Sequence, residues 1–280
     1  MGTNINTIKR LSRKFQGIYI LSPYNPDYLL VKNAIESTGV TLTSTQNNAG
    51  NTLVNQLQSY NIWGKQKTLY GILGGTAAAH KWNWINPLDT NVAYRLTFST
   101  GWTHSSTGMI PNGTSAYADT FISPNTAFTN YSGSLSYYSR TNNTNSGIDV
   151  GSLSVTGNYF MQLYSSGLLG SRASLQRNDS NYVLFSSTNR SGLFTGSITA
   201  NNSMKIYQNG VLKNTNTTTD TTALNSVKLS IGALNNNGTI QSYANRECAF
   251  FAASSGLTDT EAANFYTAVQ NYQTTLNRQV

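Results

Sequence analysis

The sequence predicts a mainly β protein, a sandwich or barrel of short strands with a short helical segment near the N-terminus and a helix at the C-terminus. Only 10% of the 280 residues are charged, against about 25% in an average soluble domain. Asn, Ser and Thr take their place and make up more than a third of the chain. Beyond residue 61, short apolar or alternating runs are separated by Gly, Asn, Ser and Pro, as is typical of strands joined by turns.

Two helices are expected between residues 27 and 60. Pro26 suits the first position of a helix, and the apolar residues that follow continue this helix until near Gly39. The second helix begins at Thr43, which forms a capping box with Gln46 three residues later. Apolar residues then recur at helical spacing up to residue 60.

The strands are expected mainly after this helical pair. Asn209-Gly210, between two apolar flanks, is the strongest hairpin signal in the chain. An earlier strand is expected over 17–21, before Ser22 and Pro23. The later candidates are the runs 94–98, 135–138, 159–164, 182–185, 204–207 and 227–231.

A C-terminal helix closes the predicted fold. Thr258 and Glu261 form a second capping box, and an apolar stripe follows on one helical face. The chain therefore divides into a basic N-terminal arm at 1–25, a helical segment at 26–62 and a β-sandwich ending in a helix at 63–280. The stripe that packs this last helix on the sandwich consists of Phe265, Val269, Tyr272 and Leu276.

The net charge of +8 comes from 18 basic and 10 acidic residues. Such a balance is compatible with nucleic acid or an anionic membrane surface as a partner. The basic residues, however, are scattered singly apart from one cluster at Lys9, Arg10, Arg13 and Lys14. This distribution favours a solvated or docking arm over a nucleic-acid-binding face.

Cys248 is the only cysteine, so neither an internal disulfide nor a cysteine zinc site is expected. Its apolar neighbours predict a buried thiol. The sequence shows no signal peptide and no window of the roughly 18 apolar residues that cross a membrane. A protein without membrane insertion, made in a reducing cytoplasm, is expected.

Catalytic and cofactor motifs are missing from the sequence, so neither an enzyme nor a bound cofactor is expected. The glycine-rich turn at 71–75 lacks the lysine of a phosphate-binding loop. A glycosidase needs paired carboxylates, whereas most of the acids here are isolated. Asp119 can be read as a calcium ligand or, more simply, as a residue that caps a turn. No metal site is predicted.

The most distinctive stretch is 79–120, which holds three of the four tryptophans and both histidines. Aromatic rings with short polar neighbours can bind sugars, and they can equally pack the corner of a sandwich. Packing is favoured for Trp82 or Trp84, and the two interpretations of Trp102 stay open. The candidate glycan contacts are Trp102, His104, Asn112 and Tyr137.

Five central motifs are HKWN at 80–83, NPLD at 86–89, GWTHSSTG at 101–108, PNGT at 111–114 and YYSRTN at 137–142. These motifs resemble a family of uncharacterised structural proteins of tailed-phage virions. The helical segment ending at 58–65 and the closing module, with its segments 206–210, 231–233 and 256–258, are also similar to that family, so the resemblance spans about 27–277. The closing module further resembles laminin-G-like and concanavalin A-like lectin sandwiches.

The resemblance implies a jelly-roll or concanavalin A-like β-sandwich on the surface of a phage particle, as a fibre, decoration or adsorption component. The protein would assemble with copies of itself and with other virion proteins, and would contact host glycans. The acidic catalytic strand of the related glucanases is missing, and no catalytic residue is carried over. Two alternatives stay open, a free glycan-binding lectin and a glycoside hydrolase of the same fold.

Overall fold

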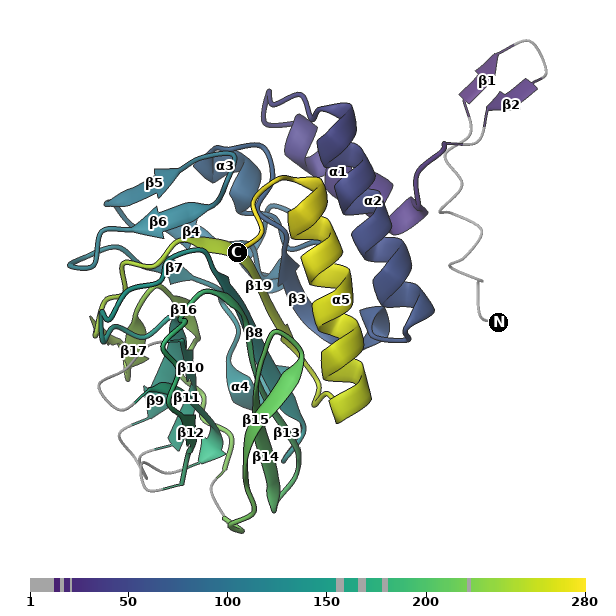
Figure 1. The fold of residues 1–280 in the computed structure, drawn as a ribbon. Coiled ribbons are helices and arrows are strands. Elements are labelled where there is room, and N and C mark those ends of the chain that lie inside the picture. The colour runs from purple at the N-terminus through teal and green to yellow at the C-terminus, as the bar shows by residue number, and fades with distance from the viewer. Residues whose placement is uncertain are drawn as a thin grey trace.

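The computed structural model describes residues 13–15, 18–20, 22–154, 159–165, 170–177, 181–220 and 223–280. Two mainly antiparallel sheets are stacked face to face, and a layer of helices covers the outer side of one of them (Figure 1). This arrangement confirms the predicted sandwich with its helical segment and C-terminal helix. A separate short hairpin joins β1 (Arg13–Phe15) to β2 (Ile18–Ile20).

The first sheet is the one that faces away from the helices. Its strand order places segments distant in the sequence side by side, with β4 at one edge. In order, the strands are β12 (Val183–Phe185), β11 (Ser171–Arg177), β10 (Tyr159–Tyr164), β9 (Val150–Ser154), β16 (Ser230–Ile231), β7 (Ala118–Asp119) and β4 (Thr97–Phe98), while β17 (Leu234–Asn236) pairs with β9 and β18 (Thr239–Gln241).

The second sheet lies between the first sheet and the helices. Strand β19 is central, since it pairs with β8, β6 and β3. In order, the strands are β15 (Val211–Asn216), β14 (Ser203–Gln208), β13 (Gly192–Ala200), β8 (Gly133–Ser139), β19 (Cys248–Ser254), β6 (Met109–Pro111) and β5 (Trp102–His104), with β3 (Gln66–Tyr70) beside β19.

Both predicted capping boxes are confirmed. The Thr43 hydroxyl accepts a hydrogen bond from the Gln46 amide at 3.1 Å, and the Thr258 hydroxyl accepts one from the Glu261 amide at 3.3 Å. These caps satisfy amides that have no partner inside the helix. The helices are α1 (Pro26–Glu36), α2 (Ser44–Ser59), α3 (Ala77–His80), α4 (Pro124–Ala127) and α5 (Asp259–Thr275), with the 3₁₀ turns η2 (Trp63–Lys65) and η3 (Asn91–Ala93).

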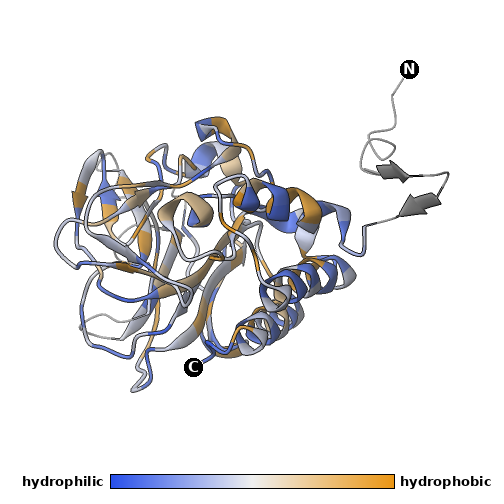
Figure 2. Ribbon diagram, turned by 90° about the horizontal axis from the view of Figure 1, so that it is seen from above, coloured by the Kyte–Doolittle hydropathy of each residue, from blue (hydrophilic) through white to orange (hydrophobic). Residues whose placement is uncertain are grey.

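Two hydrophobic cores hold the layers together. Successive residues of a strand point to opposite faces, and β19 serves both cores for this reason. Phe250 packs among the helices α1, α2 and α5, while its neighbour Phe251 packs between the sheets. Seen from above in Figure 2, the helices lie beside the sandwich and carry both hydrophilic and hydrophobic residues, as helices that bury one face do.

The Asn209-Gly210 hairpin is confirmed between β14 and β15. Both residues have positive φ, 51° and 71°, as the tight turn that matches the twist of a hairpin requires. Cys248 is confirmed as buried, and burial raises the pKa of its thiol. Trp82 and Trp84 are buried in the helix-side core, as predicted.

Two predicted strands are shorter than expected. The run 94–98 contributes only Thr97 and Phe98 to β4, because η3 precedes it and Tyr94 has a left-handed φ of 60°. The run 227–231 contributes only Ser230 and Ile231 to β16. None of the helices in the described ranges combines the length and the apolar character needed to cross a membrane.

Candidate functional site

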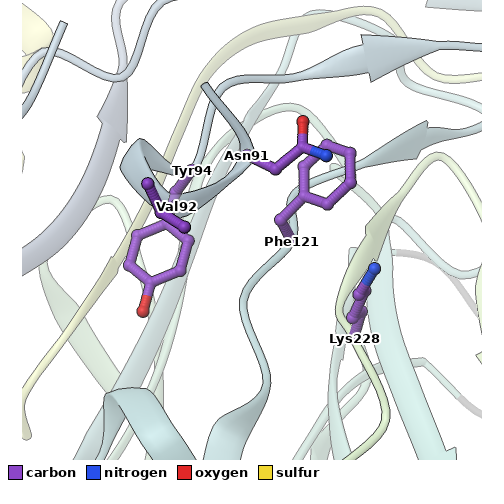
Figure 3. A pocket seen from close by; sticks show the side chains of 5 residues that line it. All are labelled: Asn91, Val92, Tyr94, Phe121 and Lys228. Carbon is purple, nitrogen blue, oxygen red and sulfur yellow. The ribbon is translucent and has the colours of Figure 1, made fainter. Parts of the chain in front are cut away.

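A groove of about 340 Å³ opens at one end of the first sheet, next to the edge strand β4. In the sheet, Asp119 of β7 lies opposite both Thr97 of β4 and Ser230 of β16. Because these neighbouring strands are antiparallel, the residues before β4, after β7 and before β16 meet at the same end. The groove, which we call the Phe121 groove, is lined by Asn91, Val92, Tyr94, Phe121 and Lys228 (Figure 3).

Two aromatic residues of the groove have a left-handed backbone. Tyr94 has a φ of 60° and Phe121 a φ of 58°, a conformation uncommon for bulky residues and costly in free energy. Local hydrogen bonds support both. The Tyr70 hydroxyl donates to the Tyr94 carbonyl at 2.5 Å, and the Phe121 amide donates to the Asp119 carboxylate at 2.7 Å. Both rings are therefore carried on a braced backbone.

Lys228 is fixed between a ring and a carboxylate. Its Nζ lies 4.7 Å from the centroid of the Phe121 ring and 3.8 Å from Asp119 Oδ2. Asp119 thus caps a turn and faces an ammonium group, which confirms the simpler of its two interpretations and disfavours a calcium ion at the same carboxylate. The part of the chain that the structure describes holds no group of three or more His, Cys, Asp or Glu residues placed to bind a metal.

The η3 side of the groove is held by Asp89. Its carboxylate accepts from Lys81 Nζ at 2.6 Å and from Arg95 at 2.8 Å, and these hydrogen bonds lower the pKa of the carboxyl. Arg95 also donates from Nε to Asn91 Oδ1 at 3.1 Å. The remaining apolar member of this wall, Val92, is 87% exposed. The wall therefore presents an amide and an apolar side chain to solvent on a braced turn.

Trp102 and Phe98 form an aromatic cluster farther along β4. Their ring centroids lie 5.6 Å apart, and Trp102 Nε1 donates to the Tyr117 carbonyl at 3.0 Å. A Cβ atom on Gly232 would lie 3.1 Å from the Trp102 ring. Any other residue at this position would therefore force the ring to shift. Trp102 is half-buried and packs a corner of the sandwich, and part of its surface stays open to solvent.

His104 and His80 form a pair at the side of this cluster. Their Nδ1 atoms lie 2.9 Å apart, and His80 Nε2 accepts from the Gly75 amide at 3.1 Å. His80 must therefore carry its proton on Nδ1 and donate it to His104. Burial, followed by the nearby His104 and Arg278, lowers the pKa of His80 to about 3, and burial also lowers the pKa of His104. Because the two Nδ1 atoms are hydrogen-bonded to each other, this pair of histidines is poorly placed to bind a metal.

The remaining predicted site residues are not at the groove. The prediction for Tyr137 is wrong, because its side chain is fully buried between the sheets and its hydroxyl donates to the Arg246 carbonyl at 2.9 Å. Asn112 is exposed, but its Oδ1 accepts from three successive amides of its own loop. Its amide group shapes that loop.

The predicted docking cluster lies largely outside the described residues. Lys9 and Arg10 fall outside them, while Arg13 and Lys14 belong to β1, whose side chains the structure does not describe. The docking role of this cluster stays a prediction.

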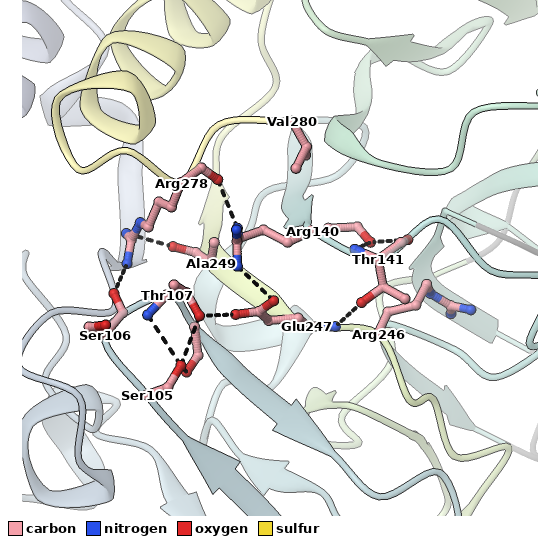
Figure 4. Close-up of polar contacts among 12 residues, drawn as sticks. Ser105, Ser106, Thr107, Arg140, Thr141, Arg246, Glu247, Ala249, Arg278 and Val280 are labelled. Atoms are coloured by element: carbon pink, nitrogen blue, oxygen red, sulfur yellow. Dashed lines mark hydrogen bonds and ion pairs between the residues drawn. The ribbon is translucent and has the colours of Figure 1, made fainter.

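A polar network away from the groove joins the C-terminal residues to the second sheet (Figure 4). Glu247 accepts from the Thr107 hydroxyl at 2.6 Å and from the Arg140 guanidinium at 2.8 Å. Arg140 also donates to the Arg278 carbonyl at 2.8 Å. Arg278 is 1% exposed and donates to the carbonyls of Gly71, Ile72 and Ala249, among others. This network is structural.

Within the described ranges, carboxylates are commonly paired with cations. Seven acids there make ion pairs with Lys or Arg, and none of these seven contacts places two carboxylates together. The pairs are Glu36 with Lys32, Asp89 with Lys81 and Arg95, Asp119 with Lys228, Asp149 with Arg246, Glu247 with Arg140, Asp259 with Lys205, and Glu261 with Lys65.

No family model matches this sequence, and no curated protein is similar to it. Among solved structures, Trypanosoma rangeli sialidase in complex with 2,3-difluorosialic acid superposes with a TM-score of 0.51 at 10% identity, over 79% of this chain and 38% of the sialidase. Domain 4 of AbnA, a GH43 extracellular arabinanase from Geobacillus stearothermophilus, gives a TM-score of 0.49 at 14% identity, over 72% of this chain and 98% of that domain.

The botulinum neurotoxin serotype D binding domain gives a TM-score of 0.48 at 13% identity, over 74% of this chain and 52% of that one. At such identities the likeness concerns the fold alone, and it agrees with the predicted class of β-sandwich. This chain spans about half of the toxin domain and less than half of the sialidase. None of these three structures is a phage protein.

Proposed function

We propose that this chain is a non-catalytic, glycan-binding β-sandwich on the surface of a bacteriophage particle, and that the Phe121 groove contacts the sugar. The observation that carries the binding role is the lining of the groove. It combines two aromatic rings, an amide and an ammonium group in one open depression of about 340 Å³.

This combination suits the two sides of a sugar ring. The apolar C–H face of a pyranose packs on an aromatic ring, and its hydroxyls accept or donate hydrogen bonds at the rim. Phe121 and Tyr94 supply the rings, and Asn91 and Lys228 supply the polar groups. The braced backbone at Tyr94 and Phe121 reduces the conformational entropy lost on binding.

A binding role without turnover is supported by the state of the acids. Glycoside hydrolysis uses two carboxyl groups on opposite sides of the scissile bond. Asp119, the carboxylate nearest Phe121, accepts the Phe121 amide and faces Lys228, and Asp89 is held by two cations. Neither is free to act with a second acid.

The particle-surface role is supported by the resemblance of motifs such as GWTHSSTG at 101–108 and YYSRTN at 137–142 to phage virion proteins. A polar surface with few charges fits an exterior protein. In this role the chain would be made in the host cytoplasm and would assemble with copies of itself and with other virion proteins. The basic cluster near the N-terminus would dock it.

The binding role is tested on a glycan array with purified protein, followed by calorimetry on the best ligand. Phe121→Ala is expected to lower the affinity at least tenfold, whereas Tyr60→Ala, at the end of α2, is expected to leave it unchanged. Absence of binding by the unaltered protein to every sugar would reject the role. Release of shortened sugar would instead support the hydrolase alternative.

The particle role is tested by immunogold labelling of purified virions with antibody against this protein. Label on the head or tail is expected. Unlabelled particles from a lysate that contains abundant protein would favour the free lectin.

A further inference from the structure

The strand β7 carries a row of side chains that extends beyond the Phe121 groove. Ala116, Ala118 and Thr120 are fully buried, whereas Tyr117, Asp119 and Phe121 are partly exposed. This alternation is that of a strand with one face toward the core. Tyr117 and Asp119 therefore share the solvent face of the strand, and the partly exposed Phe121, which has a left-handed backbone, follows the end of β7.

The row is long enough for more than one sugar. At about 3.3 Å per residue, the four steps from Tyr117 to Phe121 span at most roughly 13 Å. Phe121 closes one end beside Lys228. At the other end, the backbone of Tyr117 receives hydrogen bonds from Trp102 Nε1 at 3.0 Å and from the Ser99 amide at 2.9 Å. The two aromatic ends are thus fixed by different parts of the fold.

The space between the two rings is polar and offers unused groups. Thr97 of β4 lies directly opposite Asp119 and is exposed. Within the described residues, neither the Thr97 hydroxyl nor the Tyr117 hydroxyl makes a hydrogen bond. Both groups can therefore bond to the hydroxyls of a ligand that lies across β4 and β7.

The charges along the row cancel. Asp119 and Lys228 face each other at 3.8 Å, so an acidic ligand would meet the carboxylate and a cationic one the ammonium. An uncharged ligand avoids both of these unfavourable contacts between like charges. Aromatic rings at both ends, with the Thr97 hydroxyl between them and the Tyr117 hydroxyl at one end, match a chain of neutral sugars.

From this arrangement we infer that the outer face of β4 and β7 binds a linear, neutral oligosaccharide of at least two units, which runs from the Phe121 groove to Tyr117. This inference deepens the proposed function and rests on it. Phe121 holds the first sugar, and Tyr117 adds affinity only when the chain is long enough to reach it.

The test is calorimetry with sugars of one to six units, from separate series built of glucose, mannose and N-acetylglucosamine. In the series that binds, the affinity is expected to rise about tenfold or more between one unit and three, and then to level off. Tyr117→Ala is expected to abolish this rise while leaving the affinity for the single sugar unchanged. Tyr117→Phe, which keeps the ring, is expected to retain most of it.

Tyr60→Ala serves as a matched control on the helical layer, and circular dichroism checks that every variant is folded. Binding that does not depend on length, or stronger binding of a uronic acid chain, would overturn this inference and leave the proposed function standing. Failure of all the sugars, including those on the array, would reject the proposed function itself.

Discussion

His80 donates its Nδ1 proton to His104 Nδ1 across 2.9 Å, and this bond ties α3 to the β5 strand. A proton added to His104 would place two N–H groups face to face at this distance. His80 cannot relieve this contact by moving its proton from Nδ1 to Nε2, because Nε2 already accepts a hydrogen bond from the Gly75 amide. The folded protein therefore keeps both imidazoles neutral.

This pair predicts how stability depends on pH. A histidine in the unfolded chain has a pKa near 6.5, whereas the pKa of buried His80 is lowered to about 3. Between these values only the unfolded state binds the proton, so stability is complete above about pH 6.5 and falls as the pH is lowered. Thermal melting from pH 7.5 to 5 is expected to show this fall, and His80→Gln should flatten it.

The carboxyl groups of Asp89 and Asp259 do not change the stability between pH 5 and 7.5. The pKa of Asp89 is lowered by hydrogen bonds from Lys81 and Arg95, and that of Asp259 by hydrogen bonds from Lys205 and Tyr207. The stability that they contribute is lost only near pH 4 and below. An equal slope above pH 5 in the unaltered protein and in His80→Gln would contradict the role of the pair.

The buried ion pair of Asp149 and Arg246 predicts a large loss on neutralisation. Both side chains are fully buried, and Asp149 Oδ1 accepts from Arg246 Nε at 2.6 Å. Asp149→Asn leaves a guanidinium buried without a counter-charge, so we expect a loss of about 3–5 kcal/mol in the free energy of unfolding. Urea denaturation measures it. Lys205→Met, which removes an exposed pair with Asp259, is expected to cost less than about 1 kcal/mol.

The contact between α1 and α2 depends on Gly50. A Cβ atom there would lie 2.2 Å from the ring of Tyr28, so Gly50→Ala must displace a buried side chain. We expect a net loss of about 1–3 kcal/mol, although alanine favours helix by up to about 1 kcal/mol. Gly64→Ala is the matched control, because its Cβ meets nothing within 4 Å. Equal melting temperatures for the two variants would contradict this account.

Arg278 predicts that the last residues are needed for stability. In the described part of the chain its guanidinium pairs with no carboxylate, and its five N–H groups go to backbone carbonyls and to Gln273 Oε1 at 2.5 Å. Arg278→Ala would leave the buried Ile72 carbonyl and Gln273 Oε1 without the donor that Arg278 supplies, each at a cost of about 1–3 kcal/mol. The carbonyls of Gly71 and Ala249 would keep Tyr272 and Gln273 as donors. Chemical denaturation should show a loss of about 3 kcal/mol or more. Lys213→Ala, on exposed β15, should show none.

The sequence predicted elements whose causes are local. The capping boxes at Thr43 and Thr258 and the Asn209-Gly210 turn depend on a few neighbouring residues, and all three are present. Tyr137 was wrongly predicted as a glycan contact because both faces of β8 are buried. Tyr137 points into the core between the sheets, and its neighbour Tyr138 points into the core under the helices. The facing partners that bury this tyrosine come from distant strands.

The Phe121 groove could not be predicted in the same way. Its residues come from η3, the end of β7 and the start of β16, which meet only through the pairing of strands. The positive φ of Tyr94 and Phe121 has no signal in residue type, since neither is Gly, Asn or Asp. Lys228 is far from Phe121 in the sequence, so the sequence did not indicate that its ammonium group lies over the Phe121 ring.

The central place of β19 also determines when the molecule can be completed during synthesis. Among the described strands, β3 pairs only with β19, and Gly71, which follows β3, accepts a hydrogen bond from Tyr272, 201 residues later. A ribosome that has made only α1, α2 and β3 has therefore not yet made β19 and α5, which complete their packing. The packing of these early segments is therefore completed only when nearly the whole described chain has been synthesised.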